Sequence, residues 1–290
     1  MESWKSLGQF RGSLNPAIEH LHHAAQFVAM VGNSYLPHQP DDSQNNLHWN
    51  SDLNRLEGRW IENPKAQMSL DVVNFELILE ATDQSHHLLL DGKTKEKVIA
   101  SMRILLHACG LDADLLQPIS HFTIPSHPLD AGMAFQKPAQ QPLQEWANWW
   151  SNAQNLLGII KSSFEWPAEI RIWPHHFDTG LYIPIMRNED GGDMQSIGLG
   201  LAIADANVSE PYFYINHWSS EAISYPGTDP VIRNGVWHKI DWKGFILPGS
   251  AFLSYSSAQQ EKIAKGFFQD GVNATLHLMG KLPKIFFAND

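Results

Sequence analysis

Two histidines and an aspartate stand close together in the second half of the chain and could take part in chemistry. His175, His176 and Asp178 directly follow the pair Trp173-Pro174. In an extended segment, His176 and Asp178 would project to one face and His175 to the other. A histidine and a carboxylate two residues apart could bind a metal ion, or could form the base and orienting pair of a hydrolase. Neither site is complete, because a metal needs a third ligand and a hydrolase needs a nucleophile.

The same segment also has a purely structural interpretation. Proline lacks the N–H group that a strand ladder needs, so Trp173-Pro174 would end a strand. The two histidines and Asp178 would then satisfy backbone groups where the chain bends into Thr179-Gly180. On this interpretation the segment is a folding motif and not a site.

Polar and aromatic residues further along the chain extend the candidate site. Asp205 follows a predicted strand, and Glu210 precedes the next one. That next strand places Tyr212 and Tyr214 on one face, and an aromatic face with polar tips lines many small-molecule pockets. It could equally be a half-exposed sheet face. The candidate ligand-binding residues are therefore Trp173, His175, His176, Asp178, Asp205, Glu210, Tyr212 and Tyr214, with His176 and Asp178 as candidate metal ligands.

Three functions remain open at this point. The sequence favours a small-molecule-binding protein, with its pocket near residues 173–178 and 212–218. The first alternative is a metal-assisted hydrolase that uses His176 and Asp178. The second is a structural or interaction protein without a small-molecule site. The chain has no glycine-rich phosphate loop, dinucleotide fingerprint, His-Glu-x-x-His or Gly-x-Ser-x-Gly motif, so no cofactor is indicated.

Three segments of the second half together carry a family resemblance. They read Ile172-Trp173-Pro174-His175-His176-Phe177-Asp178, Glu210-Pro211-Tyr212-Phe213-Tyr214 and Trp237-His238. In this order they resemble a bacterial family of unknown function that carries a Trp-Pro-His-His-Phe-Asp signature. The chain departs from the family pattern at His217, which is therefore not a candidate site residue. The resemblance implies no reaction, cofactor or substrate.

Composition narrows the class of protein. The 290 residues carry a formal net charge of −11, which disfavours nucleic acid as a partner. No apolar run approaches the roughly 18 residues of a membrane span, and the N-terminus lacks the apolar stretch of a secretory signal. Cys109 is the single cysteine, so an intramolecular disulfide is impossible; it is expected to be a buried packing thiol. We therefore expect a cytoplasmic protein, and the sequence leaves its oligomeric state open.

Four helices are predicted from apolar residues spaced by three and four. They cover residues 15–32, 94–110, 143–160 and 257–280. The third has the clearest stripe, with Trp146, Trp149 and Trp150 beside one another, and we expect a core-facing surface there rather than an aromatic binding wall. The fifteen histidines are scattered, and those at positions 20, 22 and 23 of the first helix are expected at the surface.

Strands are predicted between the helices of each half. Residues 73–79 alternate and have a hairpin partner at 86–91, with Asp83 and Ser85 in the turn; residues 169–173, 181–186, 196–204 and 212–218 follow the third helix. Small residues on one face of 196–204, Gly198 and Gly200 among them, would let a helix or a ligand approach, and a helix is favoured.

The element order predicts an α+β fold with two α-β(n)-α halves, each an antiparallel sheet flanked by helices, and an internal duplication would explain it. The predicted domains are an N-terminal half, residues 1–124, a proline-rich connector, 125–142, and a C-terminal half, 143–290, which holds the signature segments.

Overall fold

The chain folds into two compact units in the computed structural model, which describes residues 3–8, 12–82, 84–118, 122–166 and 169–287. The first unit comprises Gly12–Ala147 and Arg171–Phe177, and the second comprises Met1–Arg11, Asn148–Ile170 and Asp178–Asp290. Residues 125–142, predicted to connect the halves, lie within the first unit, and the chain changes unit inside helix α3 (Gln140–Lys161).

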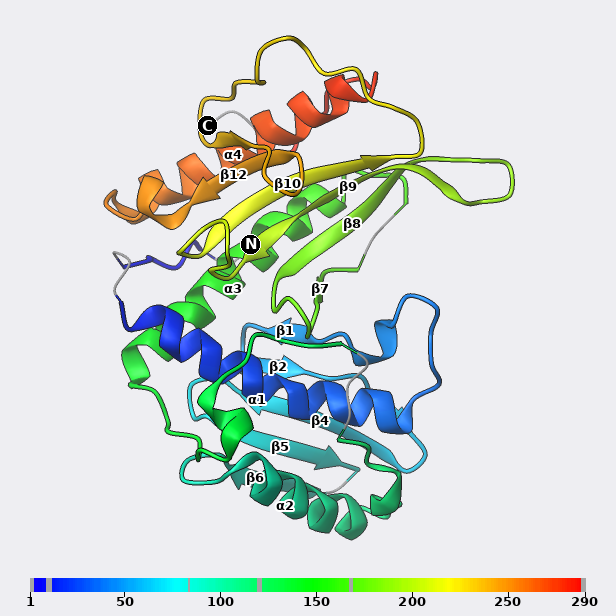
Figure 1. The fold of residues 1–290 in the computed structure, drawn as a ribbon, viewed down its shortest axis with the longest axis vertical. Helices are drawn as coiled ribbons and strands as arrows, with labels where there is room; N and C mark the ends of the chain where they lie inside the picture. The colour runs from blue at the N-terminus through cyan, green and yellow to red at the C-terminus, as the bar shows by residue number, and fades with distance from the viewer. Residues whose placement is uncertain (1–2, 9–11, 83, 119–121, 167–168, 288–290) are drawn as a thin grey trace. The chain divides into compact units, whose positions relative to one another are not determined.

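Among the described residues, the first unit contains one antiparallel sheet, two complete α-helices and the beginning of α3. The strand order is β1-β2-β4-β5-β6, and β3 pairs with β4. Figure 1 shows α1 crossing this sheet, with α2 beside β6. Its elements are α1 (Leu14–Tyr35), β1 (His48–Asn50), β2 (Arg55–Glu57), β3 (Ile61–Glu62), β4 (Lys65–Asp71), β5 (Glu76–Ala81), β6 (Gln84–Leu89), α2 (Lys95–Ala108) and the short strand β7 (Arg171–Ile172).

Helix α1 continues past the glycine that was predicted to end it. Gly32 is buried, and a Cβ at this position would overlap the carbonyl oxygen of Gln44. The glycine is therefore needed where the 3-10 turn Ser43–Asn45 approaches the helix, and the helix runs on to Tyr35. Helix α2 begins as predicted, with Thr94 accepting a hydrogen bond from the Lys97 N–H. Cys109, at the end of α2, is only half-buried, so the expectation of a buried thiol is wrong.

The first sheet differs from the prediction at its centre. The predicted strand over 73–79 begins only at Glu76, because Phe75 has φ +59° and lies in the turn after β4. Strand β4 was not predicted, although Ala66, Met68 and Leu70 alternate with polar residues along it. Its polar residues Gln67 and Ser69 are also buried and hydrogen-bonded. Ser85 lies in β6 rather than in the turn, and Asp83 lies outside the described residues.

The second unit contains the other antiparallel sheet. Its strands β8, β9 and β10 follow one another as predicted, joined by the expected hairpin loop at 188–193, and the order is β11-β12-β10-β9-β8. Strands β11 and β12 were not predicted. The elements are β8 (Thr179–Arg187), β9 (Asp193–Ala202), β10 (Tyr212–Ser219), β11 (Val236–His238), β12 (Gly244–Pro248) and α4 (Ser257–Leu278), together with the remainder of α3.

Aromatic side chains fill the core of the second unit. Trp149 of α3 packs against Phe213 of β10 at 5.7 Å between ring centroids and against Phe252 at 5.5 Å. Phe268 of α4 meets the same Phe213 at 5.4 Å, so both helices cover one face of this sheet. The predicted burial of the tryptophan stripe is confirmed.

Helix α4 begins at Ser257, the first residue of the predicted range 257–280. Ser256 and Gln259 form a capping box at its start. Gln260 is therefore buried, where its Oε1 accepts a hydrogen bond from the Leu7 N–H. This contact ties the beginning of the chain to α4 within the second unit.

The α+β class with two helix-flanked antiparallel sheets is confirmed. The order helix, strands, helix occurs twice along the chain, as a duplicated unit would require. Among the described residues, no helix combines the length and apolar character needed to cross a membrane.

Candidate functional site

The signature segment forms a tight turn on helix α1 of the first unit and not an extended strand. Residues 174–176 form the turn, and the N–H of Phe177 donates to the carbonyl oxygen of Trp173 at 2.7 Å. The carbonyl oxygen of Pro174 accepts hydrogen bonds from His22 Nε2 at 2.9 Å and Gln26 Nε2 at 2.7 Å. The segment is therefore not extended, so the condition under which the two signature histidines would project to opposite faces is not met.

The buried parts of this turn are its proline and phenylalanine. Phe177 has φ +58°, is fully buried and stacks on His22 with ring centroids 4.8 Å apart. His176 is exposed, and His175 packs against Phe122 at 5.5 Å. These contacts support the structural interpretation of the signature.

The predicted tyrosines and aspartates pair with each other in the second unit. The Tyr214 hydroxyl donates to Asp178 Oδ2, and the Tyr212 hydroxyl donates to Asp205 Oδ2, each at 2.6 Å. Asp205 Oδ1 also accepts from the Val208 N–H, so this carboxylate closes the turn between β9 and β10. Burial, together with the neighbouring carboxylates, raises the pKa of both tyrosine hydroxyls above the ordinary value.

The remaining predicted residue, Glu210, holds a backbone turn. Its carboxylate accepts hydrogen bonds from the N–H and the hydroxyl of Ser250, both at 2.6 Å. Among the described residues, no three His, Cys, Asp or Glu side chains are grouped to hold a metal ion. The predicted site residues are thus divided among the signature turn, two tyrosine–aspartate pairs and one loop contact.

The glycines of β9 are needed for close packing against the neighbouring strands of the sheet. A Cβ on Gly200 would overlap the carbonyl oxygen of Thr179 on β8, and a Cβ on Gly198 would overlap the side chain of Asn216 on β10. Helices α3 and α4 pack on the opposite face of the sheet, where Phe213 lies. The helix approach expected at these glycines is therefore wrong, and close strand contact explains them.

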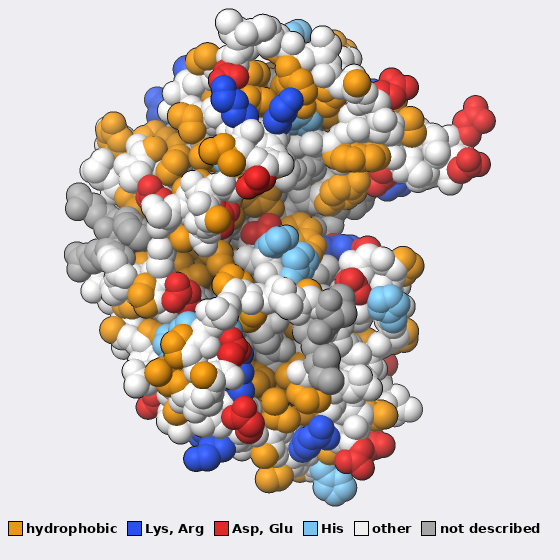
Figure 2. Space-filling model, viewed as in Figure 1, with side chains coloured by type: hydrophobic (Ala, Val, Ile, Leu, Met, Phe, Trp, Pro, Cys, Tyr) orange, Lys and Arg blue, Asp and Glu red, His pale blue; other side chains and the backbone are white. Residues whose placement is uncertain are grey.

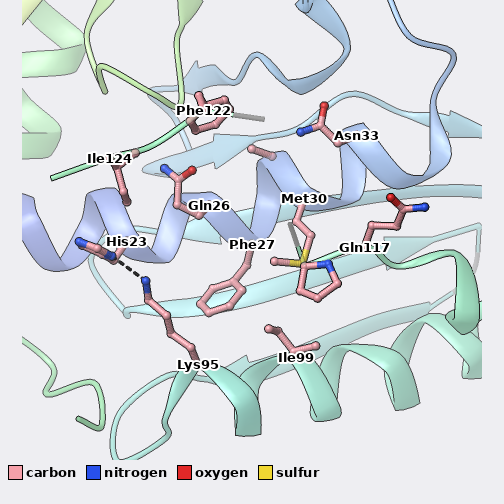
Figure 3. Close-up of a pocket in the computed structure, with 12 residues that line it drawn as sticks. His23, Gln26, Phe27, Met30, Asn33, Lys95, Ile99, Gln117, Phe122 and Ile124 are labelled. Atoms are coloured by element: carbon pink, nitrogen blue, oxygen red, sulfur yellow. Dashed lines mark hydrogen bonds between the residues drawn. The ribbon is translucent and has the colours of Figure 1, made fainter. Parts of the chain in front are cut away.

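A cavity of about 190 Å³ lies within the first unit, between α1, α2 and the chain that follows α2 (Figure 3). Apolar side chains occupy its middle, and polar side chains lie at its ends, with His23 and Lys95 at one end and Asn33 and Gln117 at the other. Its apolar lining is Phe27, Ala29, Met30, Ile99, Pro118, Phe122 and Ile124, and its polar lining is His23, Gln26, Asn33, Lys95 and Gln117.

A buried histidine and a lysine form one polar end of this pocket. Lys95 Nζ donates to His23 Nδ1 at 2.8 Å and to Asp130 Oδ1 at 2.6 Å (Figure 3). Burial lowers the pKa of His23 to about 4, and burial likewise lowers the pKa of His22 to about 4, so both imidazoles are neutral at pH 7. The expectation of a surface position is wrong for these two histidines, which are 3% and 4% exposed.

The pocket and the signature turn share two side chains. Gln26 lines the pocket and donates to the Pro174 carbonyl of the turn. Phe122 also lines the pocket, and its ring meets the ring of His175. The turn therefore supports one wall of the pocket, although His175 and His176 themselves do not line the pocket.

Sequence reasoning missed this pocket because its lining comes from three separated segments. The available signal lay in α1, whose inner face carries polar residues at positions 23, 26 and 33 among apolar ones. Buried polar groups on an otherwise apolar helix face require partners, and such partners often surround a site.

Comparison with protein-family models, with curated proteins and with solved structures finds no match for this chain. The resemblance to the Trp-Pro-His-His-Phe-Asp family therefore stays a prediction.

Proposed function

We propose that this protein binds a small, largely apolar molecule in the pocket between α1 and α2. The cavity of about 190 Å³ carries this proposal, because an apolar space with a few converging polar groups is typical of ligand sites. The position differs from the one expected from sequence, and the signature turn contributes only as support for the wall.

The size of the cavity restricts the ligand. An apolar protein cavity of about 150 Å³ binds benzene. A ligand with one ring, or a short chain, and one polar substituent is therefore the appropriate size. Met30, Phe27 and Ile99 would contact its apolar part.

The other predicted partners and functions are less well supported. A net charge of −11 disfavours nucleic acid, and on the face shown in Figure 2 the Lys and Arg side chains are scattered among acidic ones. Metal-assisted hydrolysis would need a third ligand beside His176 and Asp178, and the described residues do not group one there. A cytoplasmic location remains our expectation from the sequence.

Methyl NMR of the protein tests the proposal. Toluene, phenol and benzamide are titrated separately, and the Met30 methyl resonance reports on the pocket, while the exposed Met133 serves as the internal control. We expect at least one probe to shift the Met30 signal in a saturable manner and to leave Met133 unchanged.

Two tryptophan substitutions on α2 provide the matched comparison. Ile99→Trp places a larger side chain in the pocket and should weaken the binding of the probe by about tenfold or more, since the space is then occupied. Ile104 lies on the same helix and its side chain is 71% exposed, so Ile104→Trp should leave the binding of the probe unchanged. Absence of saturable shifts with all three probes, or equal binding by Ile99→Trp, would refute the pocket as a site.

A further inference from the structure

We infer that the pocket selects a neutral ligand whose polar group both donates and accepts a hydrogen bond, such as a primary amide or a hydroxyl, and that it discriminates against carboxylates. This inference rests on the proposed function. It concerns the polar end formed by Gln26, His23 and Lys95.

The amide of Gln26 presents an acceptor to the ligand. Its Nε2 donates to two carbonyl oxygens, that of His22 at 3.0 Å and that of Pro174 at 2.7 Å. Because a carbonyl oxygen only accepts hydrogen bonds, these two contacts consume both N–H groups and fix the orientation of the amide. Oε1 is the atom that remains, so a ligand beside Gln26 must supply a donor. The signature turn, through Pro174, thus sets the polarity of the pocket.

Lys95 presents a donor at the same end. Its ammonium group has three N–H bonds, and His23 Nδ1 and Asp130 Oδ1 accept two of them. One N–H remains for a ligand acceptor. A ligand that carries both a donor and an acceptor can satisfy the Gln26 acceptor and the Lys95 donor.

A carboxylate fits this end poorly for two reasons. It has no hydrogen to donate to Gln26 Oε1, which would stay unsatisfied in the complex. The charge of Lys95 is also already paired with the Asp130 carboxylate, whose Oδ1 lies 2.6 Å from the lysine nitrogen. Lys95 and Asp130 together carry no net charge, so nothing at this end compensates for an added anion.

Three ligands of nearly the same shape test the inference at pH 7. Benzamide donates and accepts, methyl benzoate is neutral and only accepts, and benzoate is an anion that only accepts. Titrations that follow the Met30 methyl signal should give benzamide a dissociation constant at least about fivefold lower than that of methyl benzoate, with benzoate weaker still.

Two lysine substitutions show whether the polar end causes this order. Lys95→Met removes the donor and should raise the dissociation constant of benzamide by about fivefold or more, while the dissociation constant of toluene should change little. Lys97→Met, at an exposed position of the same helix, should change neither dissociation constant. If benzoate or methyl benzoate binds as tightly as benzamide, the inference is wrong although the pocket is real. If toluene, phenol and benzamide all fail to bind, the proposed function itself is wrong.

Discussion

The two units share an order of elements but fill their cores differently. In the second unit, Trp149 and Phe268 both pack against Phe213 between the helices and the sheet. In the first unit, α1, α2 and the chain that follows α2 leave a cavity of about 190 Å³, and polar side chains such as Gln26 and Lys95 share its lining with apolar ones. The comparison shows that the packing of side chains between the elements, rather than the order of the elements, determines where a cavity remains.

The units also differ in the ionisable groups that they bury. The first unit buries His22 and His23 as neutral imidazoles, and their pKa values are lowered to about 4. The second unit buries Tyr212 and Tyr214 against carboxylates, and their pKa values are raised. The first unit should therefore lose more of its stability in acid, and the second unit should lose more of its stability in alkali.

The largest expected effect tests the filled core. Trp149→Ala should lower the free energy of unfolding by roughly 3–5 kcal/mol, because a fully buried ring is removed from between two phenylalanines. Denaturant titration followed by circular dichroism measures the change. Trp218→Ala is the control in the same unit, since this ring is 50% exposed and should cost less than about 0.5 kcal/mol. A loss below about 1 kcal/mol for Trp149→Ala would remove the contrast between the cores.

An intermediate effect is expected in acid. In the unfolded chain His22 and His23 take up protons near pH 6.5, whereas in the fold they do so only near pH 4. Their stabilising contribution is therefore complete above pH 6.5 and is lost as the pH falls toward 4, at up to roughly 1.4 kcal/mol per pH unit for each histidine.

Hydrogen exchange between pH 7 and pH 4.5, corrected for the intrinsic rates, should show the amides of α1 losing protection before those of α3 residues 148–161. His23→Gln keeps an acceptor for Lys95 and should make the protection of the α1 amides less dependent on pH. His38→Gln, at an exposed position, should leave that dependence unchanged. Equal loss of protection in both helices, or an unchanged slope in His23→Gln, would contradict the assignment of acid sensitivity to the first unit.

The smallest effect is expected in alkali. Tyrosines of the unfolded chain lose protons near pH 10, whereas Tyr212 and Tyr214 keep theirs to higher pH. Stability is thus unaffected well below pH 10 and falls as the pH rises through 10, by about 1 kcal/mol for each of the two tyrosines between pH 10 and pH 11. Urea denaturation at pH 9, 10 and 11 measures the slope. Tyr214→Phe should reduce this slope, and Tyr255→Phe, which changes an exposed ring, should leave it as in the parent protein. A slope that Tyr214→Phe leaves unaltered would argue against this origin.

The sequence by itself determined the helices and the hairpins of the second unit. Apolar residues at helical spacing are sufficient to place α3, since burial of Trp146 and Trp150 follows from one stripe. Alternation likewise located β8 to β10. Strand β4 was overlooked although Ala66, Met68 and Leu70 alternate with polar residues; its polar residue Gln67 is buried as well and donates to the carbonyl oxygen of Gly58.

Only the tertiary structure decided the candidate site. The signature looked chemical because two histidines and an aspartate follow one another, yet Pro174 and Phe177 are its buried parts and the carboxylate of Asp178 pairs with Tyr214. The pocket depends on the packing of α1 against α2, and the acceptor of Gln26 depends on two carbonyl oxygens, one of which is about 150 residues away in the chain. Periodicity reports which face of an element is buried; which groups meet across that face is fixed by long-range packing that no local spacing contains.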